Sequence, residues 1–336
     1  MLHTAISSNN IHRIRSLLSL GADINQKDLF GNTPLHIAVH TNNKNILLEL
    51  LSNPDILINV QNNDGKTPLH TAVENYCKIS VIYLLACPEI NTEIKDSLGN
   101  TPIYYCSEHL CVSILCILLY EGVNVNAINN NSQTPLHLGV CDRNFDFIKH
   151  LLEYNANPDL QDNFGNTPLN DAIWDKAGED IINILLDYGA DPTIPDDDGI
   201  TCLHGAAWRG DYDIVVTLLN YIDPNTQCTD GMTPIYLAAM DGHSDIVQLL
   251  LNNDANPDIC TNDGKTVIGV SEEITYIILL CHIGLNEIKV TDDVCPFCLE
   301  NDRLLFKVNC CNTYVHRECA IEWGRKDCPV CRMKMF

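Results

Sequence analysis

The sequence repeats itself every 32 to 34 residues, and this period constrains the fold more than any other feature. A Thr marks the same place in each unit, at positions 33, 67, 101, 134, 167, 201, 233 and 266. Pro follows that Thr in six of the eight units, and Gly stands two residues before it in all but one, where Ser132 replaces it. A period of this length is typical of a solenoid, in which each unit packs only against its neighbours.

The residues within a unit predict a turn, two helices and an extended return. The Gly predicts a tight turn, the Thr can cap a helix, and a Pro at the first helical position loses no hydrogen bond. Apolar residues such as Leu35, Ala38 and Val39 then follow at helical spacing. A second apolar stretch, such as 214–219, predicts the second helix, and Gly or Asn often ends it because both tolerate the left-handed conformation.

These units resemble the ankyrin repeat. The family signature T-P-L-H-x-A stands here as TPLHIA (33–38), TPLHTA (67–72) and TPLHLG (134–139), with degenerate copies at 101–106, 167–172, 201–206 and 233–238. The return motif of the family appears as GADIN (21–25) and GADPT (189–193). The resemblance implies a mainly α solenoid of helix-turn-helix and hairpin units. We expect about nine units over residues 1–284, the first and last acting as caps.

The charge is confined to this array. The chain carries a formal net charge of −24, and residues 1–290 account for all of it, with 37 acidic against 13 basic residues. Such acidity argues against sequence-independent binding to nucleic acid and against binding to an anionic membrane surface. We see no signal peptide and no apolar run of the roughly 20 residues that span a bilayer. The expected location is a reducing compartment, the cytoplasm, with the nucleus left open.

Several residue types in the array have a structural interpretation. We expect the histidines of the motif to bond to neighbouring turns and repeats and not to bind metal; they are His36, His70, His137 and His204. Ten cysteines are scattered singly over residues 77–281, among apolar helix residues. Because a free Cys is among the most often buried residue types, we expect buried thiols there.

One position is a candidate for binding a protein substrate. In ankyrin-like stacks, the residues just after the alanine pair of the first helix face the concave surface. At one of these positions, three consecutive units carry the large apolar residues Trp174, Trp208 and Met240. Exposed apolar strips commonly mark a partner, and Trp is enriched at binding hot spots. The alternative is that these side chains fold back onto neighbouring repeats. Hairpin tips add Leu29, Phe30, Leu98 and Phe164.

The last 46 residues have a different composition. Residues 291–336 are charge-neutral and contain seven of the 17 cysteines. A segment this short needs help to fold, and it holds eight candidate zinc ligands, enough for two tetrahedral sites. They are Cys295, Cys298, Cys310, Cys311, His316, Cys319, Cys328 and Cys331. With every position filled by protein, neither zinc would activate a water molecule.

The spacing C-x2-C-x11-CC-x4-H-x2-C-x8-C-x2-C resembles a RING finger. PHD fingers share this ligand logic, but four residues stand at RING positions: Phe297, Trp323, Pro329 and Arg332. The resemblance implies a cross-brace with two Zn²⁺. Site one would be Cys295, Cys298, His316 and Cys319, and site two Cys310, Cys311, Cys328 and Cys331.

The sequence departs from the RING pattern at one point. RING ligands three and four are usually separated, whereas Cys310 and Cys311 are adjacent. Counting back from His316 by the commonest RING spacing gives Cys311 and Thr313, and Thr is a poor zinc ligand. We prefer Cys310 with Cys311, which leaves site two complete.

Together the two resemblances imply an ankyrin-RING E3 ubiquitin ligase, with residues 1–284 as the array, 285–291 as a linker and 292–336 as the zinc finger. In this family the RING binds a ubiquitin-conjugating enzyme (E2) that carries ubiquitin, through residues here matched by Phe297, Trp323 and Pro329. Arg332 matches the cation that bridges E2 and ubiquitin. The alternative is a non-catalytic scaffold whose zinc module only mediates assembly.

Overall fold

The computed structural model describes residues 1–107 and 111–271, with Thr275 and Leu279, and the backbone of three strands beyond them. The chain divides into two compact units, Met1–Asp196 and Asp197–Phe336. Among the described residues, no helix has the length and apolar character needed to cross a membrane.

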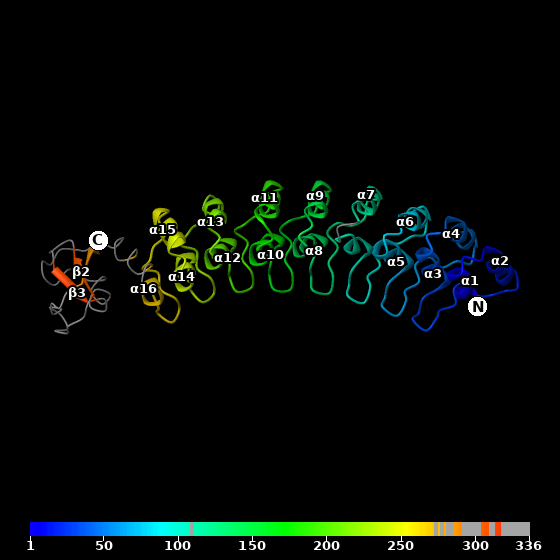
Figure 1. Cartoon of the computed structure of the whole chain (residues 1–336), viewed down its shortest axis with the longest axis horizontal. Coiled ribbons are helices and arrows are strands. Elements are labelled where there is room, and N and C mark those ends of the chain that lie inside the picture. Colours follow the sequence, from blue (N-terminus) through cyan, green and yellow to red (C-terminus); the bar gives the residue numbers. More distant parts are fainter. Residues whose placement is uncertain are drawn as a thin grey trace. The chain divides into compact units, whose positions relative to one another are not determined.

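The first unit consists of two layers of short helices (Figure 1). The inner helices pack in sequence order and are α1 (Leu2–Ser7), α3 (Pro34–His40), α5 (Pro68–Glu74), the 3₁₀ helix η1 (Pro102–Cys106), α8 (Pro135–Cys141) and α10 (Pro168–Trp174). The outer helices form the second layer and are α2 (Ile11–Ser19), α4 (Lys44–Leu51), α6 (Lys78–Leu85), α7 (Val112–Tyr120), α9 (Phe145–Glu153) and α11 (Glu179–Asp187).

The second unit continues the same pattern and then changes to strands. Its helices are α12 (Cys202–Arg209), α13 (Tyr212–Leu218), α14 (Pro234–Met240), α15 (Ser244–Asn252) and α16 (Val267–Val270). The strands β1 (Leu285–Val290), β2 (Leu304–Val308) and β3 (Thr313–His316) form an antiparallel sheet in the order β1-β2-β3. The segment 285–291, expected as a linker, therefore lies almost wholly in β1.

Each inner helix begins where the motif predicts. Thr67 occupies the N-cap of α5 in an extended conformation, and Pro68 is the first helical residue. The Thr67 hydroxyl accepts a hydrogen bond from the backbone N–H of His70, while Nδ1 of His70 accepts one from the backbone N–H of Thr67 at 3.1 Å. This reciprocal pair is a capping box in which His supplies the returning acceptor. The same box starts α3, α8 and α12.

Hairpin loops connect one repeat to the next. Asn63 donates its backbone N–H to the carbonyl of Phe30, and Asn130 donates to Leu98, at 3.0 Å in both cases. Gly65 has a φ of +75°, and a Cβ there would lie 2.7 Å from the backbone nitrogen of Ser97. Only glycine combines this left-handed conformation with so close an approach. The loops are therefore fixed by backbone contacts, which leaves their tip side chains directed outward.

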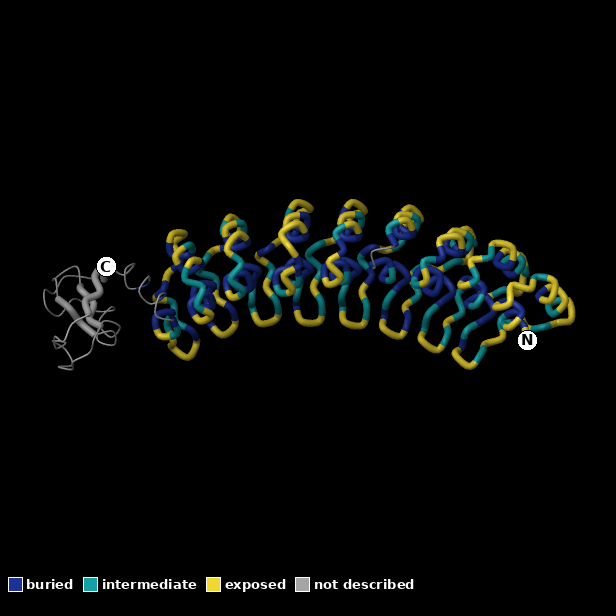
Figure 2. The backbone as a smooth tube through the Cα atoms, viewed as in Figure 1, coloured by how far each residue is buried: buried dark blue, intermediate teal, exposed yellow. Residues whose placement is uncertain are grey.

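The hydrophobic core lies between the two helical layers (Figure 2). Inner helices contribute buried residues such as Leu69, Ala72 and Val73, and outer helices contribute Val81 and Leu84. This arrangement confirms the all-α repeat solenoid. The second helix expected in the ninth repeat lies outside the described residues except for Thr275 and Leu279. The zinc-finger segment lies outside them except for β2 and β3.

The cysteines of the array follow the expectation in part. Cys77, Cys106, Cys111, Cys202 and Cys228 are buried, and Cys87 and Cys260 are half-buried. Cys116 and Cys141 are exposed, so the prediction of buried thiols is wrong for these two. Cys116 lies on the outward face of α7, and Cys141 is the last residue of α8, where an inner helix ends at the surface.

Candidate functional site

The ends of the inner helices carry the residues predicted to bind a partner. Trp174 is the last residue of α10 in the first unit and is half-buried. Trp208 in α12 and Met240 at the end of α14 belong to the second unit and are 40% and 43% exposed. Because α12 packs directly against α14, the second unit places Trp208 and Met240 on neighbouring helices at equivalent positions. Both present apolar surface to solvent.

His243 fixes the backbone next to Trp208. Its Nε2 lies 3.0 Å from the carbonyl oxygen of Trp208 and 3.2 Å from a carboxylate oxygen of Asp241. Gly210, which ends α12 in the left-handed conformation, has no room for a Cβ because the His243 ring would lie 2.5 Å from it. The apolar surface at this place is therefore held by a bridge from the following repeat.

Acidic side chains surround the equivalent place in the first unit. Asp171 lies one turn before Trp174 on α10. Burial raises the pKa of Asp171 to about 7, and the nearby carboxylates of Asp162 and Asp175 add to the effect. Desolvation and like charge both disfavour the ionised form. Asp171 does not stand out in the sequence, because the burial that raises its pKa is not part of the repeat motif.

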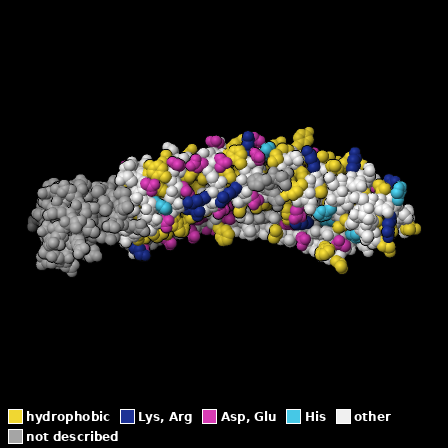
Figure 3. Space-filling model, in the orientation of Figure 1, with side chains coloured by type: hydrophobic (Ala, Val, Ile, Leu, Met, Phe, Trp, Pro, Cys, Tyr) yellow, Lys and Arg dark blue, Asp and Glu magenta, His cyan; other side chains and the backbone are white. Residues whose placement is uncertain are grey.

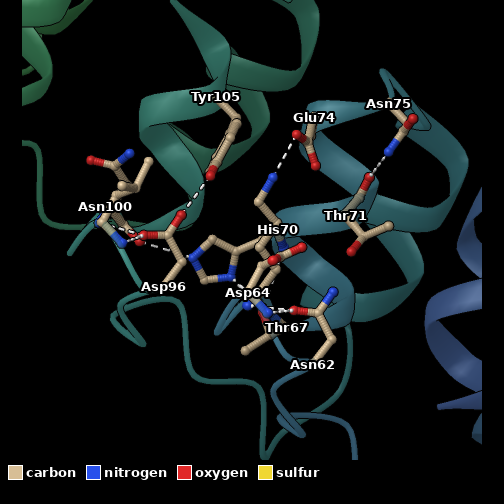
Figure 4. Close-up of polar contacts among 12 residues, drawn as sticks. Asn62, Asp64, Thr67, His70, Thr71, Glu74, Asn75, Asp96, Asn100 and Tyr105 are labelled. Carbon is tan, nitrogen blue, oxygen red and sulfur yellow. Dashed lines mark hydrogen bonds and ion pairs between the residues drawn. The ribbon is translucent and has the colours of Figure 1, made fainter. Parts of the chain in front are cut away.

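A polar cluster occupies the junction of the third and fourth repeats (Figure 4). Lys66 Nζ lies 2.6 Å from Glu74 Oε1 and 4.7 Å from the centre of the Tyr105 ring. The Tyr105 hydroxyl donates to Asp96, which is itself buried, and burial raises the pKa of Tyr105. The phenol therefore stays protonated at neutral pH. The cluster gives this part of the inner surface a fixed polar character.

The motif histidines link adjacent repeats, as predicted. Nδ1 of each lies within 2.8 Å of the cap Thr hydroxyl, and Nε2 lies 3.0 to 3.2 Å from a backbone carbonyl of the next repeat. Because Nδ1 accepts from a backbone N–H, each ring is the neutral tautomer with its proton on Nε2. Burial lowers the pKa of all four, to about 4 for His204. Among the residues that the structure describes, no cluster of His, Cys, Asp or Glu could hold a metal ion.

The hairpin tips of the first unit are apolar at alternate repeats. Leu29, Phe30, Leu98 and Phe164 are largely exposed, as the sequence predicts. The tips between them carry Asn63 with Asp64 and Asn130 with Asn131. Figure 3 shows acidic, basic and hydrophobic side chains interspersed over one face of the molecule.

The zinc-ligand set falls almost entirely outside the described residues. His316 is the last residue of β3, and its backbone is described. The other seven ligands, together with Phe297, Trp323, Pro329 and Arg332, lie beyond the described part of the chain.

Comparison with known families supports the repeat architecture. The family model described as "Ankyrin repeats (3 copies)" matches residues 2–96, 56–129, 103–196 and 203–286. The chain belongs to the ankyrin-repeat family. Residues 2–286 are thus an ankyrin-repeat domain of the protein-binding kind, whose partners are expected to be proteins.

Individual relatives share shorter stretches with this ankyrin-repeat chain. It is 44% identical over 62 residues to a putative ankyrin repeat protein of fowlpox virus, FPV031, a match that covers 17% of this chain and 18% of that protein. It is 49% identical over 49 residues to the I-Kappa-B like protein G2 of Microplitis demolitor bracovirus, covering 14% of this chain and 29% of that one. Each match spans less than a third of the relative's length.

Solved structures agree on the fold. The crystal structure of the ankyrin repeat domain of Bcl-3 is similar to this chain with a TM-score of 0.59 and 24% sequence identity. The likeness covers 65% of this chain and 99% of that domain. At this identity it shows the ankyrin fold alone.

Proposed function

We propose that this protein is a RING-type E3 ubiquitin ligase in which the ankyrin array recruits a protein substrate. The observation that carries the proposal is the spacing of eight zinc ligands in residues 295–331, combined with RING-type residues around them. A RING ligase forms no covalent bond with ubiquitin. It holds an E2 and its attached ubiquitin in one orientation, so that a substrate lysine can attack, which is catalysis by positioning.

The ligand set suits zinc. Seven thiolates and one imidazole are the donors that structural Zn²⁺ sites use, and two complete tetrahedra account for all eight. The metal would contribute folding free energy, on the order of 10 kcal/mol per site, to a segment too short to fold well alone.

The β2–β3 hairpin favours the cross-brace assignment. Val308 pairs with Thr313 across this hairpin, so Cys310 and Cys311 fall in the connection, while His316 is at the far end of β3 and pairs with Leu305. Three residues of extended strand span about 10 Å, from Thr313 to His316. Ligands of one zinc must all lie about 2.0 to 2.3 Å from the ion. Assigning His316 to one site and the cysteine pair to the other agrees with this separation.

The remaining RING-type residues have separate roles in the proposal. Phe297, Trp323 and Pro329 would form the apolar contact with the E2. Arg332 would donate hydrogen bonds to the E2 and to ubiquitin, because a guanidinium offers several donors in a fixed fork. This work would take place in a reducing compartment such as the cytoplasm, where the zinc thiolates persist.

The substrate would bind the inner surface of the array. Trp208 and Met240 are the exposed apolar residues that support this assignment in the second unit, and Trp174 stands at the equivalent position in the first. The acidic net charge of the array favours a substrate with basic residues.

A self-ubiquitination assay tests the ligase function. The zinc-loaded full chain is incubated with E1, ATP, ubiquitin and a broad panel of E2 enzymes, and ubiquitin chains are detected by immunoblot. We expect chains with at least one E2, and their loss in Cys328→Ser. Arg332→Ala should reduce the rate by about 10- to 100-fold with the zinc content unchanged. Arg303→Ala, an arginine of the same segment outside the RING positions, is the matched control.

The second candidate is a scaffold whose zinc module mediates assembly without catalysis. Absence of ubiquitin chains with every E2, from a protein that holds two zinc ions per chain, would establish the scaffold and exclude the ligase. A separate pull-down assay compares partners bound by the wild type and by Trp174→Ala with Trp208→Ala. If every partner remains bound, the inner-surface assignment is wrong.

A further inference from the structure

The outer helices of the first unit share three outward positions, which normally carry polar residues. On α9 these positions are Asp146, Lys149 and Glu153, and all three are exposed. On α11 they are Asp180, Asn183 and Asp187, and these are exposed as well. Such residues are what the solvent face of an amphipathic helix requires.

Three consecutive outer helices break this rule. Leu48 on α4 is 40% exposed, Ile82 on α6 is 45% exposed, and Tyr120 at the end of α7 is 83% exposed. Ile79 on α6 and Cys116 on α7 are exposed beside them. Because α4 packs against α6 and α6 against α7, these five residues form one surface, the outer apolar face. Figure 3 shows hydrophobic side chains at the surface over α6 and α7.

The fold does not require this exposure. The buried half of α6, with Val81 and Leu84, is equivalent to the buried half of α9, with Ile148 and Leu151. The two helices therefore contribute the same kind of core while differing in their outward residues. A helix that is apolar around its whole circumference is normally buried on all sides. An exposed side of such a helix is typical of a binding surface.

Basic residues border the outer apolar face. The outer helices α2, α4, α6 and α7 carry the four cations Arg13, Arg15, Lys44 and Lys78 and a single acidic residue, Glu49. By contrast, α9 and α11 carry five carboxylates, Asp146, Glu153, Glu179, Asp180 and Asp187, against one lysine. Arg15 is paired with Glu49 at 2.9 Å, and Glu121 is exposed directly after Tyr120. The positive charge is therefore confined to the N-terminal ends of α4 and α6, where Lys44 and Lys78 stand.

Two of these cations stand at helix N-termini, where a positive charge destabilises the helix. Lys44 is the first residue of α4 and Lys78 is the first residue of α6, where the helix dipole disfavours a positive charge. The equivalent place on α11 is Glu179, which the dipole favours. Both lysines are exposed, and Lys44 lies 5.5 Å from the centre of the Tyr83 ring, between α4 and α6. The Tyr83 ring offsets part of this cost for Lys44, and both lysines remain accessible to a partner.

We propose that the outer apolar face binds an amphipathic segment of a protein partner whose apolar side chains are bordered by carboxylates. Its apolar residues would cover Leu48, Ile82 and Tyr120, and its carboxylates would meet Lys44 and Lys78. A symmetric second copy is less favourable, because an isologous contact would bring the lysines of both copies into one interface. An anionic membrane is also less favourable, because the acidic repeats on α9 and α11 would repel it. Within the first unit, the outer apolar face lies on the outer helices, whereas Trp174 of the proposed substrate surface lies on the inner helix α10.

A peptide-display selection on the full chain tests this proposal. A library of randomised 16-residue peptides is selected against the wild type, and enriched clones are screened by fluorescence anisotropy against Ile82→Glu. We expect clones with apolar residues at helical spacing together with Asp or Glu. Ile82→Glu should weaken their binding by about tenfold or more. Lys44→Glu with Lys78→Glu should give a similar loss, and wild-type binding should weaken as salt is added.

Lys149→Glu is the matched control, because Lys149 stands on α9 at the position that Ile82 occupies on α6. Its binding should equal that of the wild type, and thermal melts followed by circular dichroism confirm that each variant is folded. Clones that depend on Ile82 but carry basic or neutral residues overturn the proposal, as does a selection without any Ile82-dependent clone. Wild-type dimers that Ile82→Glu dissociates, or Ile82-dependent binding to phosphatidylserine–phosphatidylcholine vesicles, would instead identify another occupant.

Discussion

The third and fourth repeats are neighbours that start their inner helices from related motifs and reach different structures. In the third, Thr67 and His70 bond to each other and α5 follows as a regular α-helix. In the fourth, Tyr104 stands where the other repeat has His70, and the inner segment is the 3₁₀ helix η1. The Thr101 hydroxyl is buried without a hydrogen-bond partner.

The comparison shows that the motif histidine has two roles, a helix cap within its own repeat and a hydrogen bond to the next repeat. His70 Nε2 bonds to the carbonyl of Asn100 in the following repeat, and the Tyr104 hydroxyl donates to the equivalent carbonyl of Gln133. Tyrosine therefore preserves the link between repeats. It has no acceptor that could replace Nδ1, so the cap within the repeat is lost. Thr233, which precedes Tyr236, also has a buried hydroxyl without a partner.

The largest expected loss of stability comes from removing the helix cap and the link between repeats together. His70→Ala leaves the Thr67 hydroxyl and the Asn100 carbonyl without their partners and opens a cavity. We expect the free energy of unfolding to fall by about 2 to 4 kcal/mol, measured by urea denaturation. His40→Ala, at an exposed position of α3, should change it by less than about 0.5 kcal/mol. Equal losses in the two variants would contradict the structural role of His70.

The sixth repeat, with Asn170 at the same motif position, extends the comparison to charge. Asp171 beside it has a pKa of about 7, well above its unfolded value, because of burial. The unfolded chain therefore releases this proton at lower pH, and stability declines as pH rises from about 4 to 7. Asp171→Asn should raise the free energy of unfolding at pH 8 by about 1 to 3 kcal/mol and have little effect at pH 4. Thermal melts at both pH values, with Asp180→Asn as the exposed control, measure the difference.

Lowering the pH should decrease the free energy of unfolding through the motif histidines, which is the opposite of its effect through Asp171. The pKa of His204 lies near 4 in the folded protein, below its unfolded value near 6.5, because of burial. Stability from the neutral ring is fully present above pH 6.5 and declines as pH falls toward 4. His204→Asn adopts the residue that the sixth repeat uses and should make the midpoint of thermal unfolding less dependent on pH between 6.5 and 4.5. An unchanged pH dependence would mean that His204 is not the responsible group.

The smallest effect gives the most direct contrast between the two neighbouring repeats. Thr67→Val removes a bonded hydroxyl and should cost about 1 to 2 kcal/mol, because the His70 ring loses a partner. Thr101→Val removes a buried hydroxyl that has no partner and should be neutral or stabilising by up to about 1 kcal/mol. Chemical denaturation of both variants compares the same substitution in two environments. A similar cost at both positions would contradict the difference in their hydrogen bonding.

Much of the array can be predicted from its sequence because its interactions are local. The cap Thr, the Pro at the first helical position and the Gly of each turn act within a few residues, so the helix starts follow directly from the motif. The histidine links follow from the repeat register. The 3₁₀ form of η1 and the raised pKa of Asp171 could not be predicted in this way, because the motif specifies neither the helix type after Thr101 nor the burial of the Asp171 carboxyl. The outer apolar face also escaped prediction, although aligning the outer helices position by position would have found the missing charges on α6.

The sequence by itself determined the period, the start of each inner helix, the acidic charge of the array and a spacing of cysteines and one histidine suited to zinc. Each of these is a property of residue order. The tertiary structure decided which apolar residues stay in contact with solvent. The repeat register puts Ile82 on the outward side of α6 and Val81 on the inward side, but only the structure shows that Ile82 stays 45% exposed. The physical reason is that the exposure of an outward side chain depends on what packs over it in three dimensions, and residue order does not state that.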